Sequence, residues 1–464
     1  MIANLQPYPE YKESGLPWLG RMPRHWELKR GKSIFERIDK RSADGKEELL
    51  TVSSARGVVP RKTATVTMFK AESYRGYKLC WPGDLVINSL WAWGGGLGVS
   101  QHHGIISSAY GVYRIRKGTP VSPAFIHEVV RSTPFNWELQ VRSKGIWISR
   151  LQLTDESFLD APFHMPPPEE QAAMVRFLHY ANGRLERAIR AKRNVIALLH
   201  EQKQAIIHRA VTRGLDPTVS LKPSGVPWLG DIPKHWELKR IKYLLREVDH
   251  RSTTGSEPLL SMRMHHGLVV FAEHFSRPPQ AATLVGFKIV RPGQFVVNRM
   301  QAGNGVIFAS KLKVTGLVSP DYAVFDPIGN ANVDFLGELF RSRKVRAKFR
   351  AESKGLGTGS SGFLRLYNDR LGAIHVALPP RGEQSSILLG VADELSGVNT
   401  AINRLEREIE LLREYRRRLV ADVVTGKLDV RPAAKHLPME PEKFEDLVED
   451  GELLDEVELK KTEA

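Results

Sequence analysis

The feature that most constrains the fold of this 464-residue chain is an internal repeat. The phrase SGLPWLG at residues 14–20 returns as SGVPWLG at 224–230, and the six residues HWELKR at 25–30 return unchanged at 235–240. Further matches at the same offset of 210 are Pro82–Asn88 with Pro292–Asn298 and Ser143–Gly145 with Ser353–Gly355. Solenoid repeats have periods of about 20–50 residues, so a unit this long is a domain. We therefore predict two copies of one domain, followed by a C-terminal segment.

Each copy divides into a mixed part and a helical part. The mixed part contains short apolar runs between Gly and Pro residues, which are typical of strands. These runs are Leu85–Ile87, Val112–Ile115, Phe295–Val297 and Ala323–Phe325. The helical part begins after a proline stop, at Pro166–Pro168 in copy one and Pro379–Pro380 in copy two, where Glu170-Gln171 and Glu383-Gln384 match at an offset of 213. Proline followed by acidic residues indicates a helix start.

Apolar residues in both helical parts follow heptad a/d spacing, which is typical of a coiled coil. A single amphipathic helix packing on its own domain also explains one such pattern, but two matching patterns favour helices that pack on each other. The predicted coiled-coil residues are Ile189, Ile196, Leu199 and Ile206 in copy one, and Ile402, Leu405, Ile409, Leu412 and Leu419 in copy two. We expect Asn182-Gly183 and Ser396-Gly397 to break each region into a short and a long helix.

The chain is strongly basic. Its formal net charge is +16, which favours an acidic partner such as nucleic acid. Residues 438–464 carry 11 acidic and 3 basic side chains, so the basic character belongs to the rest of the chain. Cys80 is the single cysteine, which excludes disulfides and Cys-based metal sites. No signal peptide or membrane-spanning run is evident, and we expect a cytoplasmic protein.

Catalytic motifs are missing from the sequence. Glu27-x-Lys29 and Glu237-x-Lys239 resemble part of a metal-dependent nuclease site, but such a site also needs an upstream Asp, and copy one has Arg21 where copy two has Asp231. We therefore predict no catalytic residue and no metal site. A free-standing nuclease and a coiled-coil scaffold that binds no DNA remain as alternatives. Loss of cutting in a Glu27→Ala/Glu237→Ala variant would favour the first, and absence of salt-dependent DNA binding would favour the second.

Four features resemble the specificity subunit of type I restriction–modification systems. The first is the opening phrase SG-x-PWLG followed by P-x-HWELKR, at 14–30 and 224–240. The second is PGDLVIN, then WAWGGGLGVS and GIISSAY at 82–110, which copy two keeps more loosely between Asn298 and Tyr322. The third is the PP-x-x-EQ entry to a long helix, and the fourth is the duplicated two-part layout. The resemblance covers about residues 8–430 and leaves out the acidic tail.

The resemblance implies a non-catalytic, sequence-specific DNA-binding subunit. Each mixed part would read one half of a bipartite double-stranded DNA target, which is asymmetric because the two parts differ in sequence. The helices would form an antiparallel spacer and dock two methyltransferase (M) subunits, and restriction/translocase (R) subunits would join the complex. S-adenosylmethionine, ATP and Mg would act in those partners, and this chain would hold no cofactor.

The expected architecture is an α+β fold with a pseudo-two-fold internal repeat, in which two mixed α/β target recognition domains are separated by a long antiparallel helical coiled coil. The expected segments are recognition domain 1 at 1–165, spacer 1 at 166–216, recognition domain 2 at 217–378, spacer 2 at 379–430 and an acidic tail at 431–464.

Candidate DNA contacts are chosen as side chains that hydrogen-bond to bases or phosphates from projecting loops. In copy one they are Arg56, Arg61, Lys62, Gln101, His102, Lys144 and Arg150. In copy two they are Arg263, His265, His266, Arg299, Gln301, Lys354 and Arg365. Lys144/Lys354 and Arg150/Arg365 occur in both copies, and we assign them to phosphate positioning. The unshared residues are the better candidates for base reading.

Overall fold

The computed structural model describes residues 5–64, 71, 73–145, 151–264, 266–275, 278–329, 331–356 and 363–438. The chain forms two compact units, and each contains segments that are distant in sequence. The N-terminal unit joins residues up to Lys192 with the segment that begins at Arg407, and the C-terminal unit contains Arg193–Glu406. Each unit holds a mixed α/β domain and one half of each of two long helices. The predicted fold class is confirmed.

The N-terminal α/β domain is built on a four-stranded antiparallel sheet with the order β4-β11-β8-β9. Its strands are β4 (Phe35–Arg37), β8 (Leu85–Ile87), β9 (Leu97–Val99) and β11 (Gly111–Ile115). Two-stranded pairs surround this sheet: β1 (Tyr11–Glu13) with β2 (Arg21–Pro23), β3 (Glu27–Arg30) with β12 (Pro162–Met165), β5 (Leu50–Ser53) with β6 (Gly57–Pro60), and β7 (Lys78–Cys80) with β10 (Gly104–Ile106). The helical segments are α1 (Gly31–Ile34), η1 (Arg61–Thr63), η2 (Ala92–Gly94), α2 (Pro123–Arg131), α3 (Thr133–Arg142) and α4 (Asp155–Leu159).

The C-terminal α/β domain repeats this plan. Its four-stranded sheet has the order β16-β23-β20-β21, formed by β16 (Leu245–Val248), β20 (Phe295–Val297), β21 (Ile307–Ala309) and β23 (Ala323–Pro327). The pairs are β13 (Leu221–Pro223) with β14 (Asp231–Pro233), β15 (Glu237–Arg240) with β26 (His375–Leu378), β17 (Leu260–Arg263) with β18 (Gly267–Val270), β19 (Lys288–Val290) with β22 (Gly316–Val318), and β24 (Lys354–Leu356) with β25 (Phe363–Arg365). The helical segments are η4 (Ile241–Tyr243), α6 (Phe271–His274), η5 (Ala302–Asn304), α7 (Val333–Arg341), α8 (Arg343–Glu352) and α9 (Asn368–Ala373). All four strands expected from apolar runs are confirmed as β8, β11, β20 and β23.

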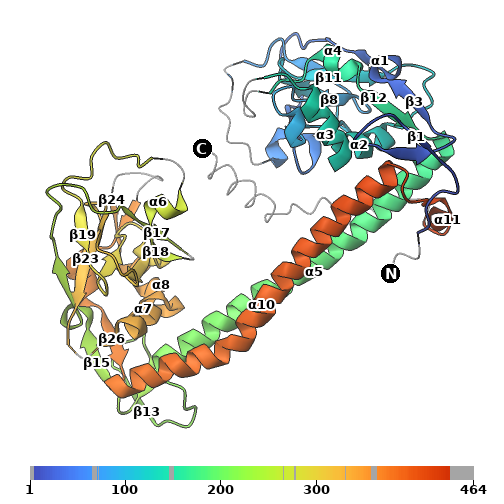
Figure 1. Cartoon of the computed structure of the whole chain (residues 1–464). Coiled ribbons are helices and arrows are strands. Elements are labelled where there is room, and N and C mark those ends of the chain that lie inside the picture. Colours follow the sequence, from blue (N-terminus) through green and yellow to red (C-terminus); the bar gives the residue numbers. More distant parts are fainter. Residues whose placement is uncertain are drawn as a thin grey trace. The chain divides into compact units, whose positions relative to one another are not determined.

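The two long helices, α5 (Pro168–Arg213) and α10 (Arg381–Val424), pack antiparallel. Figure 1 shows them side by side. Polar contacts between them confirm the direction, because the partner's number falls along α10 as the number rises along α5. In the N-terminal unit Glu186 contacts Arg416, and Lys192 lies 2.5 Å from Glu408. In the C-terminal unit Lys203 donates to Asn399 at 2.8 Å, and Arg209 lies 2.9 Å from Glu394.

Both expected helix breaks are wrong. The α5 helix runs through Asn182-Gly183 and α10 runs through Ser396-Gly397 without interruption. A glycine inside a helix costs only about 1 kcal/mol relative to alanine. Burial of neighbouring apolar side chains, such as Leu178 and Leu185 in α5, outweighs that cost.

The duplicated PP-x-x-EQ motif fixes each long helix to its α/β domain. Gln171 is fully buried, accepts the backbone N–H of Ser122 at 2.9 Å, and donates to the carbonyls of Pro120 at 3.1 Å and Pro166 at 2.8 Å. In copy two Gln384 accepts from the Asn332 N–H at 2.7 Å and donates to Pro379 at 2.8 Å.

The glutamate of this motif pairs with the histidine of the HWELKR phrase in both copies. His25 lies 2.8 Å from Glu170, and His235 lies 2.7 Å from Glu383. The two most specific sequence motifs are thus partners across the junction between domain and helix, which gives them a structural role.

The hydrophobic core of each unit is continuous from the α/β domain into the helices. In the N-terminal unit, Trp26 and Phe163 share one core with Leu419 and Val423 of α10. In the C-terminal unit, Trp236 shares a core with residues of both α5 and α10. Helix and domain therefore fold as one body within each unit.

The segment that the sequence assigns to the tail begins with an ordered turn. The short helix α11 (Arg431–Ala434) packs Ala434 into the N-terminal core, and Arg431 pairs with Asp429 at 2.7 Å. Residues 439–464 lie outside the described residues. Among the helices that the structure describes, none combines the length and the apolar character needed to span a bilayer.

Candidate nucleic-acid interface

Five of the candidate DNA contacts in copy one lie on the β5–β6 hairpin, the 3-10 turn η1 that follows it, and the loop before β10. Arg56 is exposed in the hairpin turn and donates to the Thr63 carbonyl at 2.6 Å, which ties the turn to η1. Lys62 pairs with Glu48 at 2.7 Å, and this hydrogen bond lowers the pKa of Glu48. The backbone N–H of Ile105, three residues after His102, donates to the Glu48 carbonyl at 2.9 Å, which brings the loop before β10 next to Glu48.

The other two of these five candidates are Arg61 and Gln101. Arg61 lies in η1 beside Lys62, and Gln101 is exposed next to His102. The structure thus brings together the positions from 56 to 62 and 101 to 102, which are separated by about 40 residues of sequence.

Arg131 at the end of α2 holds the hairpin turn in place. Its guanidinium donates to the carbonyls of Ser54 at 2.6 Å, Ala55 at 2.7 Å and Leu97 at 2.9 Å. Arg56 therefore projects from a turn whose backbone is fixed by an arginine of the domain, and less ordering entropy is lost when such a turn binds.

The shared residue Lys144 lies apart from this group. It is exposed after α3, and its backbone exchanges two 2.9 Å hydrogen bonds with Gln152. The other shared candidate of copy one, Arg150, lies outside the described residues, as does His265 of copy two.

Copy two places Arg263 and His266 at the β17–β18 turn, which corresponds to the turn that carries Arg56. The Arg263 guanidinium lies 5.3 Å from the centre of the Phe275 ring, within the range of a cation–π contact. His266 is exposed and packs edge-on against His274.

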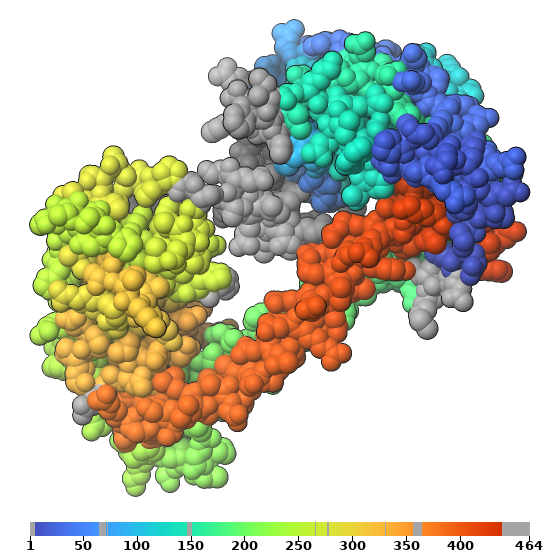
Figure 2. All heavy atoms as spheres, in the orientation of Figure 1, coloured from blue at the N-terminus to red at the C-terminus, as the bar shows by residue number. Residues whose placement is uncertain are grey.

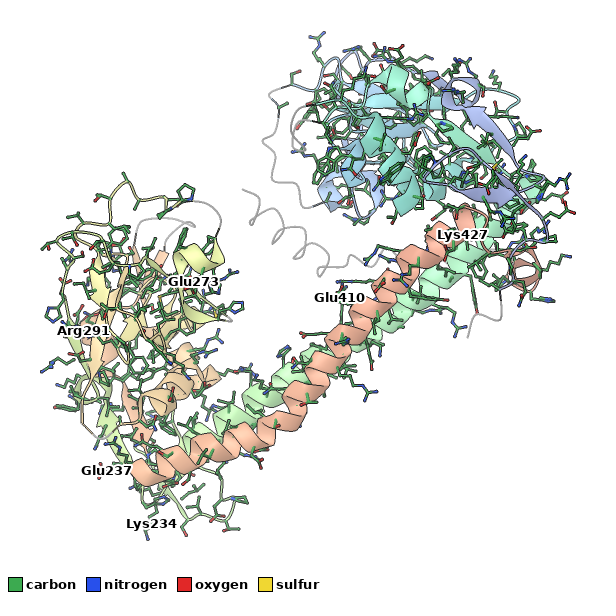
Figure 3. All side chains as sticks on the ribbon, viewed as in Figure 1. Lys234, Glu237, Glu273, Arg291, Glu410 and Lys427 are labelled. Atoms are coloured by element: carbon green, nitrogen blue, oxygen red, sulfur yellow. The ribbon has the colours of Figure 1, made fainter. Side chains whose placement is uncertain are left out.

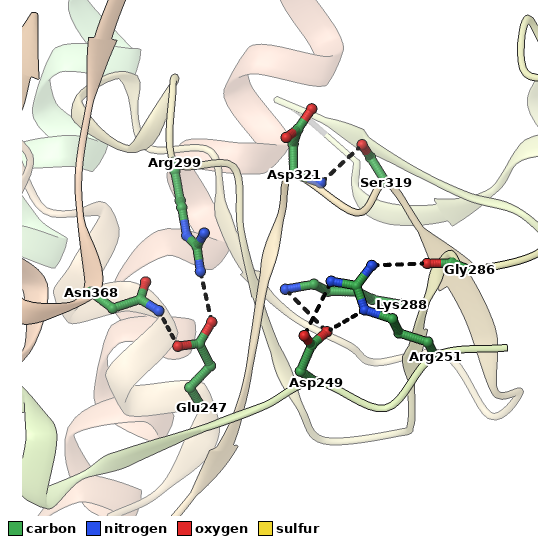
Figure 4. A network of polar contacts seen from close by, with 9 residues as sticks. All are labelled: Glu247, Asp249, Arg251, Gly286, Lys288, Arg299, Ser319, Asp321 and Asn368. Atoms are coloured by element: carbon green, nitrogen blue, oxygen red, sulfur yellow. Dashed lines mark hydrogen bonds and ion pairs between the residues drawn. The ribbon is translucent and has the colours of Figure 1, made fainter. Parts of the chain in front are cut away.

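Arg299 has a defined structural partner. Its guanidinium donates to Glu247 at 2.6 Å, and the other oxygen of that carboxylate contacts Asn368 (Figure 4). The side chain is only 17% exposed. A role in base reading, which remains a prediction, would require Arg299 to exchange this ion pair for a DNA contact.

The corresponding positions in copy one form a different ion pair. Arg37 occupies the place of Glu247, and Asp155 occupies the place of Asn368. Arg37 and Asp155 lie 2.8 Å apart. Both copies therefore join the edge strand of the sheet to a short helix, through an ion pair in copy one and through the contact of Glu247 with Asn368 in copy two.

A second network beside Arg299 occurs in both copies. Asp249 accepts from Arg251 at 3.1 Å and from Lys288 at 3.4 Å (Figure 4), and the hydrogen bond from Arg251 lowers the pKa of Asp249. Asp39 and Arg41 form the same pair in copy one, at 3.1 Å. Since this network is shared, we assign it to the framework of the domain.

The remaining candidates of copy two surround the η5 loop. Gln301 is exposed immediately before η5. Lys354 is exposed in β24, opposite Arg365 of β25. The Arg365 guanidinium lies 5.7 Å from the ring centre of Tyr367, and the backbone of Leu366 donates to Arg299. Arg299, Gln301, Lys354 and Arg365 thus come from connected elements.

The predicted coiled-coil residues are all partly or fully withdrawn from solvent. Ile189, Ile206, Ile402, Ile409 and Leu419 are buried, and Ile196, Leu199, Leu405 and Leu412 are half-buried.

The residues considered for a nuclease pair with each other. Glu27 and Lys29 lie 3.3 Å apart on β3, and Glu237 and Lys239 lie 2.8 Å apart on β15, with both carboxylates exposed. Within the described part of the chain, no group of three or more His, Cys, Asp or Glu side chains is arranged to hold a metal ion.

One cationic cluster is not among the residues predicted from the sequence. The α8 helix carries Arg343, Lys344, Arg346, Lys348 and Arg350, where α3 in copy one has Thr133, Pro134, Asn136, Glu138 and Gln140. A direct comparison of the two copies could have found this cluster, because residues 343–350 are rich in Arg and Lys where residues 133–140 are not.

Comparisons with known proteins concern the fold. No protein-family model matches the chain, and the curated proteins gave no match. Among solved structures, a chain from a study of complex assembly and conformational transition of the type I restriction–modification system matches with a TM-score of 0.57 at 15% identity, over 87% of this chain and 98% of that chain. The HsdS subunit from Thermoanaerobacter tengcongensis matches with a TM-score of 0.42 at 14% identity, over 88% and 98% of the two chains. The S subunit of a type I system from M. genitalium gives a TM-score of 0.32 at 10% identity, over 90% and 99%. The chain therefore shares its fold with a solved component of the type I restriction–modification system, the family that its sequence motifs resemble.

Proposed function

We propose that this chain is the DNA-specificity subunit of a type I restriction–modification complex and has no catalytic activity of its own. The observation that carries the proposal is the division between shared and unshared residues in the two copies. The shared motifs pair with each other across the junction of domain and helix, as in His25–Glu170 and His235–Glu383. The unshared polar residues lie at loops such as the β5–β6 and β17–β18 turns. One framework that carries two different sets of exposed side chains fits a protein that reads two different half-sites.

In this proposal residues 1–165 and 217–378 are the target recognition domains, and 166–216 and 379–430 form the spacer. Because the two recognition domains differ at their exposed turns, the target is bipartite and asymmetric. Lys144 and Lys354 contact phosphates in either half, while Arg56 and His266 read bases in one half each.

The chain acts in the cytoplasm on double-stranded DNA and docks two M subunits and the R subunits. The partners supply adenine methylation with S-adenosylmethionine, and ATP-driven translocation and cleavage with Mg. The fold match to a type I system supports this assembly.

Methylation mapping tests the proposal. The chain is co-expressed with its neighbouring methyltransferase gene in a host without adenine methylation, and the genome is read by long-read sequencing. We expect modified adenines in a split motif with a fixed gap, and none when the methyltransferase is expressed alone. A His266→Ala variant should relax one half of the motif and leave the other unchanged. Unmodified DNA despite a soluble complex would refute the proposed function.

A further inference from the structure

The C-terminal unit contains a basic groove of about 920 Å³ between its α/β domain and its halves of α5 and α10. One wall consists of α8, the η5 loop and the end of α7. Apolar side chains of α5 and α10 form the floor. Among the residues that the structure describes, five cationic side chains line the groove, against one carboxylate, Glu338. They are Lys203, Arg341, Arg343, Arg346 and Arg350. In Figure 2 the orange surface of α7 and α8 lies next to the first part of α10.

The arginines of α8 share one face of the helix. Positions 343, 346 and 350 are spaced by three and four residues, which places them on one stripe. The stripe is about 10 Å long, from a rise of 1.5 Å per residue. One DNA strand carries a phosphate for every 3.4 Å of helix axis, so a stripe of this length aligned with that axis corresponds to about three phosphates.

The η5 loop is shaped to admit these arginines. Gly305 has a positive φ of 87°, and a Cβ there would lie 2.9 Å from Nε of Arg346. A Cβ at Gly303 would lie 3.0 Å from Cβ of Arg350. Between the two glycines, Asn304 accepts from the Arg350 guanidinium at 2.7 Å. The loop therefore packs directly on the arginine face and orients one of its members.

The cationic side chains of the groove crowd one another. Burial lowers the pKa of Arg346, and the neighbouring charges of Arg350 and Arg341 lower it further. Acidic residues do pair elsewhere on α8, where Lys348 contacts Glu352 at 2.5 Å, on a different side of the helix. A bound anion would relieve the repulsion among the groove arginines and replace their lost hydration.

Only copy two has this feature. The positions of Arg343, Arg346 and Arg350 correspond to Thr133, Asn136 and Gln140 in copy one, at the repeat offset. The loop opposite them has Trp93 in place of Gly303. The corresponding helix of the N-terminal unit thus presents neutral polar groups.

We propose that the α8 groove is a phosphate-backbone clamp for double-stranded DNA, specific to the C-terminal half, in which Arg343, Arg346 and Arg350 bind consecutive phosphates of one strand. The proposal rests on the proposed function. The position of the groove supports DNA as the ligand, because predicted base contacts lie beside its lining. Met264 lines the groove and directly follows Arg263. Gly303 also lines the groove and lies two residues after Gln301. The C-terminal half then supplies more of the sequence-independent affinity than the N-terminal half.

Salt-dependent binding of a fluorescent DNA duplex to the full-length chain, alone and in complex with its methyltransferase, tests the clamp. The variant is Arg343→Gln/Arg346→Gln/Arg350→Gln. Each phosphate contact contributes about 0.9 to the slope of log K against log salt, so the slope should fall by about 2 to 3. Affinity in 0.1 M salt should fall by about 50- to 500-fold.

Two control variants separate the clamp from general effects. Lys234→Gln/Arg291→Gln/Arg381→Gln removes the same charge from exposed positions outside the groove, two of which are labelled in Figure 3, and should leave the slope within about 0.5 of its original value. Arg343→Lys/Arg346→Lys/Arg350→Lys keeps the charge and should keep most of the slope. Its binding distinguishes loss of charge from loss of fold.

The outcomes are distinct. If the original chain binds DNA and the glutamine variant keeps its affinity and slope, the clamp is refuted and the proposed function stands. If the glutamine variant loses its methyltransferase and keeps its DNA affinity, the groove binds protein and the clamp is likewise refuted. If the original complex itself does not bind DNA, the proposed function fails.

Discussion

Replacing Gln171 by methionine should selectively destabilise the N-terminal unit. Methionine has a similar length and volume, so the change removes hydrogen bonds with little cavity formation. The amide of Gln171 makes three hydrogen bonds, to Ser122, Pro120 and Pro166. The bond to the Pro166 carbonyl is buried, and leaving that carbonyl unsatisfied costs about 1–3 kcal/mol. The other two bonds are partly buried and contribute about 0.5–1.5 kcal/mol each. The expected total loss in free energy of unfolding is about 2–6 kcal/mol.

Hydrogen exchange followed by mass spectrometry can assign this loss to one unit. Peptides that cover α2 and the start of α5 should lose protection in Gln171→Met, while peptides from the C-terminal unit should not. The matched change Gln384→Met should have the opposite pattern and a smaller effect, since two bonds of Gln384 are at stake. Gln140→Met, on the exposed face of α3, serves as the control. A loss under about 1 kcal/mol, or equal deprotection of both units, would refute the view that this glutamine locks helix to domain.

Three further predictions concern pH, an ion pair and the tail. Burial lowers the pKa of His127 and of His164 to about 4, below the unfolded value near 6.5, so the N-terminal unit should lose stability as pH falls from 6.5 towards 4, by about 2 kcal/mol per histidine at pH 5. Urea unfolding at pH 7 and pH 5 should show a smaller loss for His164→Phe, and an equal loss would contradict the assignment. Arg299→Ala should destabilise the chain by about 1–2 kcal/mol, and Glu247→Gln should cancel most of this in the double variant, as a double-mutant cycle of unfolding can measure. Removing residues 439–464 removes a net charge of −8 and should raise duplex affinity by roughly 3- to 10-fold at low salt, and an unchanged affinity in fluorescence anisotropy would count against a long-range effect.

The repeat made most of the fold predictable, because a pattern that occurs in both copies indicates a structural element rather than a chance similarity. Short apolar runs located β8, β11, β20 and β23, and the heptad pattern located α5 and α10. The helix breaks failed because local propensity at Gly183 and Gly397 is weaker than the packing of a 46-residue and a 44-residue helix.

The candidate site was less predictable, because residue type alone does not separate a DNA contact from a framework ion pair. Arg299 was chosen as an unshared cation, yet the structure pairs it with Glu247. In copy one, Arg37 at the position of Glu247 pairs instead with Asp155. A comparison of single positions shows only that the charge differs. The contacts become visible only when the partners are compared as well, because Glu247 replaces Arg37, Asn368 replaces Asp155, and Arg299 replaces Ser89.

The same reasoning separates α8 from this framework. In the framework, copy two gains Arg299 where copy one has Ser89, and this cation is matched by Glu247, which replaces Arg37. At α8 copy two gains Arg343, Arg346 and Arg350, and the described lining of their groove contains a single carboxylate. Charge that is crowded and unmatched within a domain destabilises it unless an anionic ligand compensates. The comparison of the copies therefore supports the basic groove as the site where the C-terminal half binds an anionic ligand, which we propose to be the phosphate backbone of DNA.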